Sequence, residues 1–266
     1  MAFRFNSVSN LYKNLGRFDA IVEFIEISIR DFIYQAEETG DFDGFLQIKS
    51  KQHNISVHSV DKSVYRARIS HSYILSVYQT SELFLHQFRE EHMDFYNIVW
   101  TLDDTGDDLL IKTIRKISSI NSAISNIGEH RLSLFKYYRT IRNKYSHDMI
   151  RDNRVDKQFQ ILNQFLPQIQ LDYVGLAAPN EYDKISFDDF ILFTRTIKDI
   201  AYKLNDLVIP KNEQFADYYK RKNIFIELNE NPLRKNNALK GHMLSNFGIE
   251  NTQANIIINM LNVPLA

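Results

Sequence analysis

The sequence predicts an all-α protein. Long stretches place apolar residues at steps of three and four, which is the period of a helix that buries one face. The chain of 266 residues has only 8 glycines and 5 prolines, which favours helices over a turn-rich β fold. Its hydrophobic content of 44% is ordinary for a globular protein. We therefore expect a helical bundle with additional helices at both ends.

Composition excludes several classes of function. The net charge is −1, so no global basic field attracts nucleic acid, and any RNA contact must come from a local patch. The chain has no cysteine, which excludes disulfides, thiolate metal sites and a cysteine nucleophile. No run of about 18 apolar residues occurs, so no membrane span is expected. The N-terminus lacks the apolar core of a signal peptide, and we expect a cytoplasmic protein.

Three parts of the chain differ in pattern. Residues 1–60 contain a helix over 17–35 and are expected to form an N-terminal helical extension packed on the core. Residues 45–60 are hard to assign, and 55–60 is interpreted as a connector. The core domain is predicted over 61–209, and a C-terminal helical extension over 210–266.

The predicted core domain begins with a long helix over 61–92. The acidic turn 103–108 resembles a cation loop only weakly, and capping of the next helix, over 109–120, is the favoured role. Residues 118–125, rich in serine and asparagine, are predicted to be a loop or a frayed end. Ser186 to Asp189 forms a capping-box variant that opens a strong helix ending before Pro210.

The C-terminal extension has its own pattern. Its basic residues, among them Lys220, Arg221 and Lys222, adjoin Tyr218 and Tyr219. That combination suits single-stranded RNA, but neighbouring acids dilute the charge and a solvated helix face is favoured. Near the end, two helices are predicted around Gly248, packed on the core or on a second subunit.

One predicted helix, over residues 129–150, carries the candidate chemistry. Its apolar stripe is Leu134, Tyr138, Ile141 and Tyr145, continued by Met149. Arg139, Asn143 and His147 lie four apart and form a row, which at about 100° per residue falls nearly opposite that stripe. Arg142 and Ser146 lie between the two faces. The helix therefore offers a phosphate-binding cation and a titratable imidazole on one short segment.

The segment from Arg142 to His147 resembles the Arg-Asn-x-x-x-His form of the R-x(4–6)-H motif of HEPN domains (higher eukaryotes and prokaryotes nucleotide-binding). The resemblance covers roughly residues 60–208. It implies a HEPN-like helical bundle, and many HEPN domains are metal-independent ribonucleases that act as dimers. It also implies that a polar or acidic residue on the preceding helix faces the same cleft. Glu82 is the candidate for that position, although a glutamate at the edge of the apolar stripe and exposed to solvent is the favoured alternative.

Cleavage of RNA without a metal requires a general acid or base and a cation at the phosphate. A histidine with a pKa of about 6.5 can exchange protons at neutral pH, so His147 is the predicted acid–base residue, and Arg142 is the predicted phosphate ligand. Asn143 can orient either the imidazole or a phosphate. Arg139, Ser146 and Lys144 are expected to support RNA binding, although solvation is favoured for Lys144. An exposed, non-catalytic His147 is the alternative, and the other histidines show no i, i+4 pairing that would suggest a metal site.

The expected function is a metal-independent endoribonuclease, with a toxin–antitoxin or anti-phage defence setting taken from what HEPN proteins often do. No cofactor is expected. The reaction needs both a general acid and a general base, but the motif supplies one histidine per chain. We therefore expect a homodimer in which two motif helices form a composite cleft. A neutralising antitoxin or a sensor is a candidate partner. The alternative is a non-catalytic HEPN-like module for dimerisation or nucleotide binding that serves a partner protein.

Overall fold

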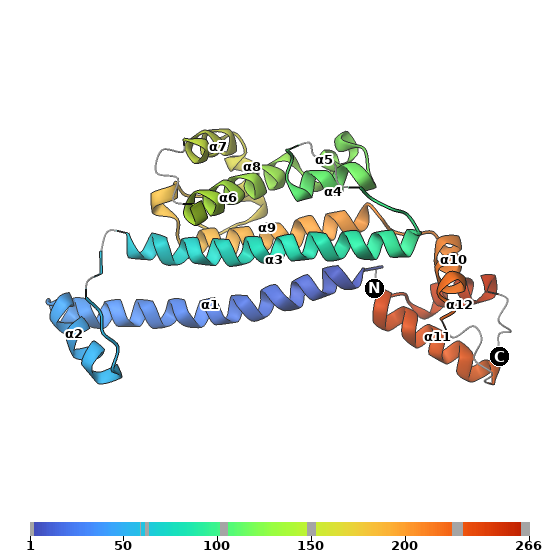
Figure 1. The fold of residues 1–266 in the computed structure, drawn as a ribbon, viewed down its shortest axis with the longest axis horizontal. Helices are drawn as coiled ribbons and strands as arrows, with labels where there is room; N and C mark the ends of the chain where they lie inside the picture. The colour runs from blue at the N-terminus through green and yellow to red at the C-terminus, as the bar shows by residue number, and fades with distance from the viewer. Residues whose placement is uncertain are drawn as a thin grey trace. The chain divides into compact units, whose positions relative to one another are not determined.

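The computed structural model describes residues 3–58, 60–61, 64–101, 106–147, 153–224 and 231–261. Within these ranges the chain is helical and has no β-strand, which confirms the predicted all-α class (Figure 1). In chain order the elements are α1 (Asn6–Glu38), α2 (Phe42–His53), α3 (Tyr65–Tyr96), α4 (Leu109–Ile117), α5 (Ile120–Ile127), α6 (Glu129–His147), α7 (Arg154–Asn163), α8 (Leu166–Asp172), the 3-10 turn η1 (Tyr182–Lys184), α9 (Phe187–Asp206), α10 (Asn212–Lys222), α11 (Pro232–Phe247) and α12 (Asn251–Met260).

Helix α2 occupies much of the stretch that the apolar pattern could not assign. The side chain of Asp41 accepts a hydrogen bond from the backbone N–H of Gly44 at 3.0 Å and so caps the start of this helix. Asn54 ends it in the left-handed conformation, with φ of 53°. Residues 55–58 follow as irregular backbone, as predicted for the connector.

Helix α5 corrects one prediction. Residues 118–125 were expected to be a loop or a frayed end, but they contain most of this helix. Ser119 is its N-cap, and the Ser119 hydroxyl accepts from the backbone N–H of Ser122 at 3.2 Å. Ala123 and Ile127 are buried, so packing stabilises a segment whose composition alone suggests a turn.

Helix α4 begins as the acidic turn predicts. The Asp108 carboxylate accepts from the backbone N–H of Ile111 at 2.9 Å, which is an N-cap contact. Positions 103–105 of that turn lie outside the described residues.

The described chain forms two compact units. Unit 1 comprises 1–12, 81–129 and 198–266, and unit 2 comprises 13–80 and 130–197. Helices α1, α3 and α9 contribute residues to both. The three-part domain organisation expected from the sequence stays a prediction.

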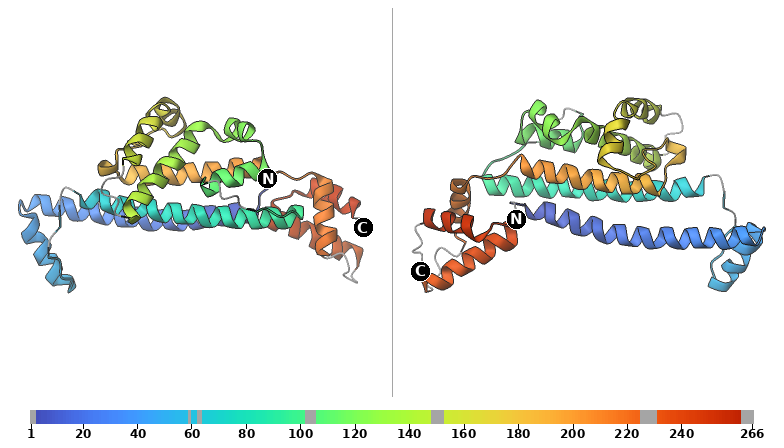
Figure 2. Two further views of the ribbon diagram at one scale, coloured as in Figure 1. Left: turned by 45° about the horizontal axis from the view of Figure 1, so that its top comes forward. Right: turned by 180° about the vertical axis from the view of Figure 1, so that it is seen from behind.

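Unit 2 contains the motif helix α6. In this unit α3 and α9 lie between α1 and α6 (Figures 1 and 2). On the α1 side, the rings of Phe18 and Phe190 lie 5.8 Å apart between centroids. On the α6 side, the ring of Tyr138 lies 4.7 Å from that of Phe193. The predicted α3 stripe, including Ile74 and Val77, is buried between these layers.

Unit 1 is organised around aromatic rings. Phe3 packs edge-on against Phe215 with centroids 5.5 Å apart, and Phe95 packs against Phe215 at 5.1 Å. Helices α11 and α12 meet around Gly248, which has φ of 68°, so the helix pair predicted there is confirmed. The C-terminal helices therefore pack on the chain's own core rather than forming a separate tail.

Candidate functional site on helix α6

Helix α6 buries the apolar stripe that its sequence predicts. Leu134, Tyr138 and Ile141 are fully buried, and Tyr145 is half-buried. Met149, which was expected to continue the stripe, lies outside the described residues. The stripe fixes the rotation of α6 about its axis, and that rotation determines where the motif residues point.

The motif arginine is packed rather than extended into solvent. The Arg142 guanidinium lies 4.5 Å from the centroid of the Tyr78 ring on α3, and its Nη1 donates to Oδ1 of Asn143 at 2.9 Å. Arg142 and Asn143 are both half-buried. The two neighbouring motif residues therefore form a pre-positioned pair at the face of α6 that meets α3.

The polar row is less exposed than its spacing predicts. Arg139 and Asn143 are half-buried, so the expectation that the row faces fully outward is wrong for these two residues. The reason is that α3 packs close to this side of α6, as the Arg142–Tyr78 contact shows. His147 is the last residue of α6, and its side chain lies outside the described residues. Ser146 is exposed.

Lys144 differs from the favoured prediction of a solvated side chain. It is half-buried, and its ammonium lies 4.2 Å from the centroid of the Tyr182 ring in η1. A cavity of about 380 Å³ adjoins this contact, and its acidic lining residues are Asp156, Glu181 and Asp183. Clustered carboxylates repel a phosphodiester, so this cavity is not a continuation of an RNA track.

His71 on α3 is a residue that the motif analysis did not single out. It is 3% exposed, stacks on Tyr182 with centroids 4.3 Å apart, and lies 5.4 Å from the ring of Tyr145. A cavity of about 110 Å³ is lined by His71, Lys144 and Tyr145 among others. A signal was present in the sequence, because His71 precedes Ile74 and Tyr78 at helical spacing on the buried stripe.

The protonation state of His71 follows from its contacts. Its Nε2 lies 3.0 Å from the carbonyl oxygen of Tyr182, which can only accept, so Nε2 carries the proton. Nδ1 is buried and has no hydrogen-bond partner among the residues that the structure describes. Burial lowers the pKa of His71 from 6.5 to about 4, against the opposing effects of the Tyr182 carbonyl and Asp183. His71 is therefore a neutral imidazole at pH 7, with an unprotonated nitrogen near the end of α6.

The loop that carries Tyr182 is held by the start of α9. The buried Asp189 carboxylate accepts from Tyr138 Oη at 3.0 Å, from Asn180 N at 2.9 Å and Nδ2 at 2.8 Å, and from Ser186 N at 2.9 Å and Oγ at 3.1 Å. The bond from Ser186 N to the Asp189 side chain is one of the two contacts of the predicted capping box. Burial raises the pKa of Asp189, although these bonds act in the opposite direction.

A second hydrogen bond ties the same loop to α6. The Tyr137 hydroxyl donates to the carbonyl oxygen of Asn180. Tyr137 is fully buried, so its ring packs in the core. Because Asn180 also binds Asp189, the loop before η1 is fixed between α6 and α9, and this fixes Tyr182 beside Lys144.

Glu82 is half-buried on α3. It belongs to unit 1, whereas Arg142, Asn143 and His147 belong to unit 2. Its expected role beside the motif stays a prediction.

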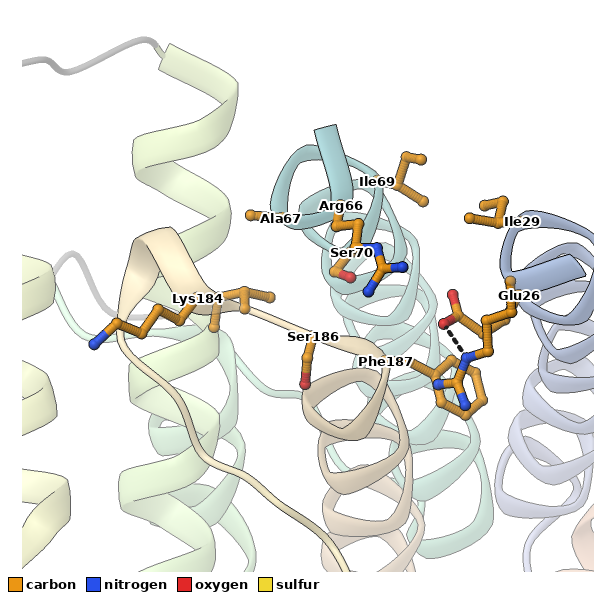
Figure 3. A pocket seen from close by; sticks show the side chains of 11 residues that line it. Glu26, Ile29, Arg66, Ala67, Ile69, Ser70, Lys184, Ser186 and Phe187 are labelled. Carbon is orange, nitrogen blue, oxygen red and sulfur yellow. Dashed lines mark hydrogen bonds and ion pairs between the residues drawn. The ribbon is translucent and has the colours of Figure 1, made fainter. Parts of the chain in front are cut away.

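Another cavity in unit 2, of about 500 Å³, is lined by residues of α1, α3 and the start of α9, and not by Arg142 or Asn143 (Figure 3). Arg66 points toward it. Arg30 forms an ion pair with Glu26 at 2.7 Å, and its guanidinium lies 5.7 Å from the centroid of the Phe187 ring. The Lys184 ammonium points away from the cavity. The Glu26 carboxylate neutralises Arg30, so the cavity lining is mixed in charge and is not a specific binding site for phosphate.

Among the described residues, no cluster of histidine, aspartate and glutamate has the arrangement of a metal site. None of the helices in the described ranges combines the length and apolar character of a membrane span.

Comparisons with protein-family models, with curated proteins and with solved structures found no match to this chain.

Proposed function

We propose that this chain is a metal-independent endoribonuclease of the HEPN type, with Arg142, Asn143 and His147 as its catalytic residues. Arg139, Lys144, Ser146 and Glu82 support RNA binding in this proposal. The proposed setting is a toxin or anti-phage defence effector, which a neutralising antitoxin or a sensor partner controls.

The observation that carries the proposal is the Arg142–Asn143 pair at the end of α6. A hydrogen bond of 2.9 Å joins the two side chains, and the aromatic face of Tyr78 supports the guanidinium. A guanidinium held in one orientation loses less entropy when it binds phosphate oxygens. His147 ends the same helix, within about two turns of Arg142.

The chemistry requires only these groups and the RNA itself. The ribose 2′-oxygen attacks the adjacent phosphorus, its proton passes to a base, and the 5′-oxygen leaves after receiving a proton from an acid. The products are a 2′,3′-cyclic phosphate and a 5′-hydroxyl. Imidazole supplies proton transfer, typically about 10²–10⁴-fold in rate, and Arg142 stabilises the negative charge of the phosphorane.

Two copies of α6 complete the proposed site. One His147 serves as base and the other as acid, so that each has one task in a turnover. This composite cleft requires a homodimer in which the ends of the two α6 helices are adjacent.

Cleavage of total RNA by the purified chain, with EDTA present, tests the enzyme. We expect wild-type protein to produce 2′,3′-cyclic phosphate ends, and His147→Ala and Arg142→Ala to lose at least 100-fold in rate. The matched controls are His86→Ala and Arg195→Ala, which remove exposed side chains of the same types. Equal activity in all five proteins identifies a contaminant, and no activity in any of them favours a non-catalytic binding module.

Mixing tests the composite cleft. Active wild-type protein that sediments strictly as a monomer at micromolar concentration contradicts it. If the two inactive variants exchange subunits, the mixed dimer holds only one intact His147 and therefore lacks either the base or the acid, so we expect it to stay inactive. Recovery of activity in the mixture would contradict a cleft that needs both histidines.

A further inference from the structure

We propose that the outer face of α1 is a homodimer interface, in which α1 of a second copy packs antiparallel about a two-fold axis close to Phe24. This outer face comprises Arg17, Ile21, Phe24, Ile27, Asp31 and Tyr34.

The apolar part of the outer face is exposed in the single chain. Phe24 is 71% exposed, and Ile21, Ile27 and Tyr34 are also exposed. Single exposed apolar residues are common, whereas neighbouring exposed apolar residues often mark interaction sites, so this row of four is a candidate binding surface. At about 100° per residue, these side chains fall within one half of the helix circumference.

The opposite side of α1 already has its partners. Val22 and Ile33 are buried there, and Phe18 contacts Phe190 of α9. Because α3 and α9 cover that side within unit 2 (Figure 1), α1 cannot rotate to bury its outer face without giving up this core. The outer face therefore needs a partner from outside the unit.

The charges on the outer face identify that partner as a second copy. Arg17 lies seven residues before Phe24, and Asp31 lies seven residues after it, so both lie about two turns away on the same side of α1. Both are exposed, and the Asp31 carboxylate accepts from Gln35 Nε2 at 2.6 Å. Antiparallel pairing centred on Phe24 brings Arg17 of each copy opposite Asp31 of the other. The two-fold axis therefore creates two such pairs.

The same symmetry pairs the apolar residues. Ile21 and Ile27 lie three positions on either side of Phe24, so they meet each other across the axis, and the two Phe24 rings meet at it. A parallel arrangement instead opposes Arg17 to Arg17 and Asp31 to Asp31. Contacts between like charges disfavour the parallel arrangement, so the charges determine that the two α1 helices pair antiparallel. Burial of the apolar row supplies most of the binding free energy.

This interface is separate from the composite cleft proposed above. Within unit 2, α3 and α9 lie between α1 and α6, so pairing through α1 leaves the two motif helices on outward sides (Figures 1 and 2). If both interfaces form, the assembly is larger than a dimer. The α1 proposal stands whether or not the chain cleaves RNA.

Mass measurement by sedimentation of the full chain tests the interface. We expect Phe24→Asp to halve the mass of the wild-type assembly at about 10 μM and to weaken self-association at least 100-fold. Leu171→Asp is the matched control, because Leu171 is 72% exposed on α8. Circular dichroism checks that each variant keeps its helices. A wild-type monomer at this concentration, or an unchanged mass in Phe24→Asp, overturns the proposal.

Charge reversal tests the pairing of Arg17 with Asp31. Each single change, Arg17→Asp or Asp31→Arg, brings like charges together and is expected to weaken association about 10-fold. The double variant restores opposite charges and is expected to return to near the wild-type value. Additive weakening in the double variant overturns the pairing.

Crosslinking tests the direction, because the chain has no cysteine of its own. Under mild oxidation Phe24→Cys should form a covalent dimer, since the axis brings the two positions within reach of a disulfide. Arg17→Cys and Asp31→Cys should crosslink efficiently only when the two proteins are mixed. Efficient crosslinking of Arg17→Cys with itself identifies a parallel pair and overturns the antiparallel arrangement.

Discussion

The Arg142 guanidinium lies 4.5 Å from the centroid of the Tyr78 ring, and this contact joins the motif helix α6 to α3. The same guanidinium donates to Asn143 at 2.9 Å. A cation that stacks on an aromatic face stays charged but becomes less mobile. The contact typically contributes about 0.5–2 kcal/mol of favourable interaction energy. The contact holds Arg142 against α3, in the position that the proposed phosphate binding would use.

Replacing Tyr78 tests whether that position matters for the proposed cleavage. We expect Tyr78→Phe to keep near-wild-type activity, because the ring remains. Tyr78→Leu removes the aromatic face, and we expect a loss of about 10-fold in the rate of RNA cleavage. Because Tyr78 is buried, thermal unfolding must accompany the assay, at a temperature at which both variants are folded. Equal rates in the two variants would show that the ring does not position Arg142.

Buried histidines make the stability of the chain depend on pH. Burial lowers the pKa of His71 and of His92 from 6.5 to about 4. Between these values the unfolded chain binds more protons than the folded chain, so the free energy of unfolding falls as the pH drops from 6.5 to 4. The two pKa shifts together correspond to at most about 7 kcal/mol, at about 1.36 kcal/mol per unit.

The variant His71→Gln isolates one of the two contributions. Glutamine can still donate to the Tyr182 carbonyl but does not titrate, so its urea-unfolding free energy should fall less between pH 7 and pH 4.5 than that of wild type. His53→Gln, at an exposed position, is the control and should behave as wild type. A pH dependence of His71→Gln identical to wild type would exclude a contribution from His71.

Asp189 is expected to be the most sensitive polar residue of unit 2. Its carboxylate accepts bonds from Tyr138, Asn180 and Ser186. Asp189→Ala leaves several buried donors without a partner, at about 1–3 kcal/mol each, so we expect a loss of at least about 3 kcal/mol in the free energy of unfolding. Asp188→Ala removes the acceptor of one bond, from Ala177 N at 2.8 Å, and should cost about 1 kcal/mol. Similar losses in the two variants would contradict a special role for Asp189.

The cap of α5 gives a smaller and more local prediction. Ser119→Ala removes the acceptor of the Ser122 N–H and should cost about 1 kcal/mol in denaturant unfolding. Ser125→Ala, at an exposed position inside the same helix, should change stability by less than about 0.5 kcal/mol. If Ser119→Ala is as stable as the control, the serine does not act as a cap.

Periodicity determined which faces of the long helices are buried. The buried stripes of α3 and α6 were predicted because a helix that buries one face has apolar residues spaced three and four apart in its sequence. The caps at Asp108 and Ser186 were also predicted, because capping is a contact between near neighbours in the chain.

The prediction made from amino-acid composition was wrong for residues 118–125. The serines and asparagines at 118–125 indicated a loop, yet Ala123 and Ile127 are buried and the segment is helical. The motif was visible as Arg142, Asn143 and His147, but the sequence could not reveal that Arg142 packs on Tyr78, which belongs to a different helix.

The sequence alone determined the all-α class, the buried faces and the motif, since all three depend on short-range spacing along one helix. Tertiary structure decided what those faces meet. It placed His71 beside Tyr182, gathered five hydrogen bonds on Asp189, and left the row around Phe24 exposed. Contacts between distant segments depend on how helices pack together, and no local pattern encodes that.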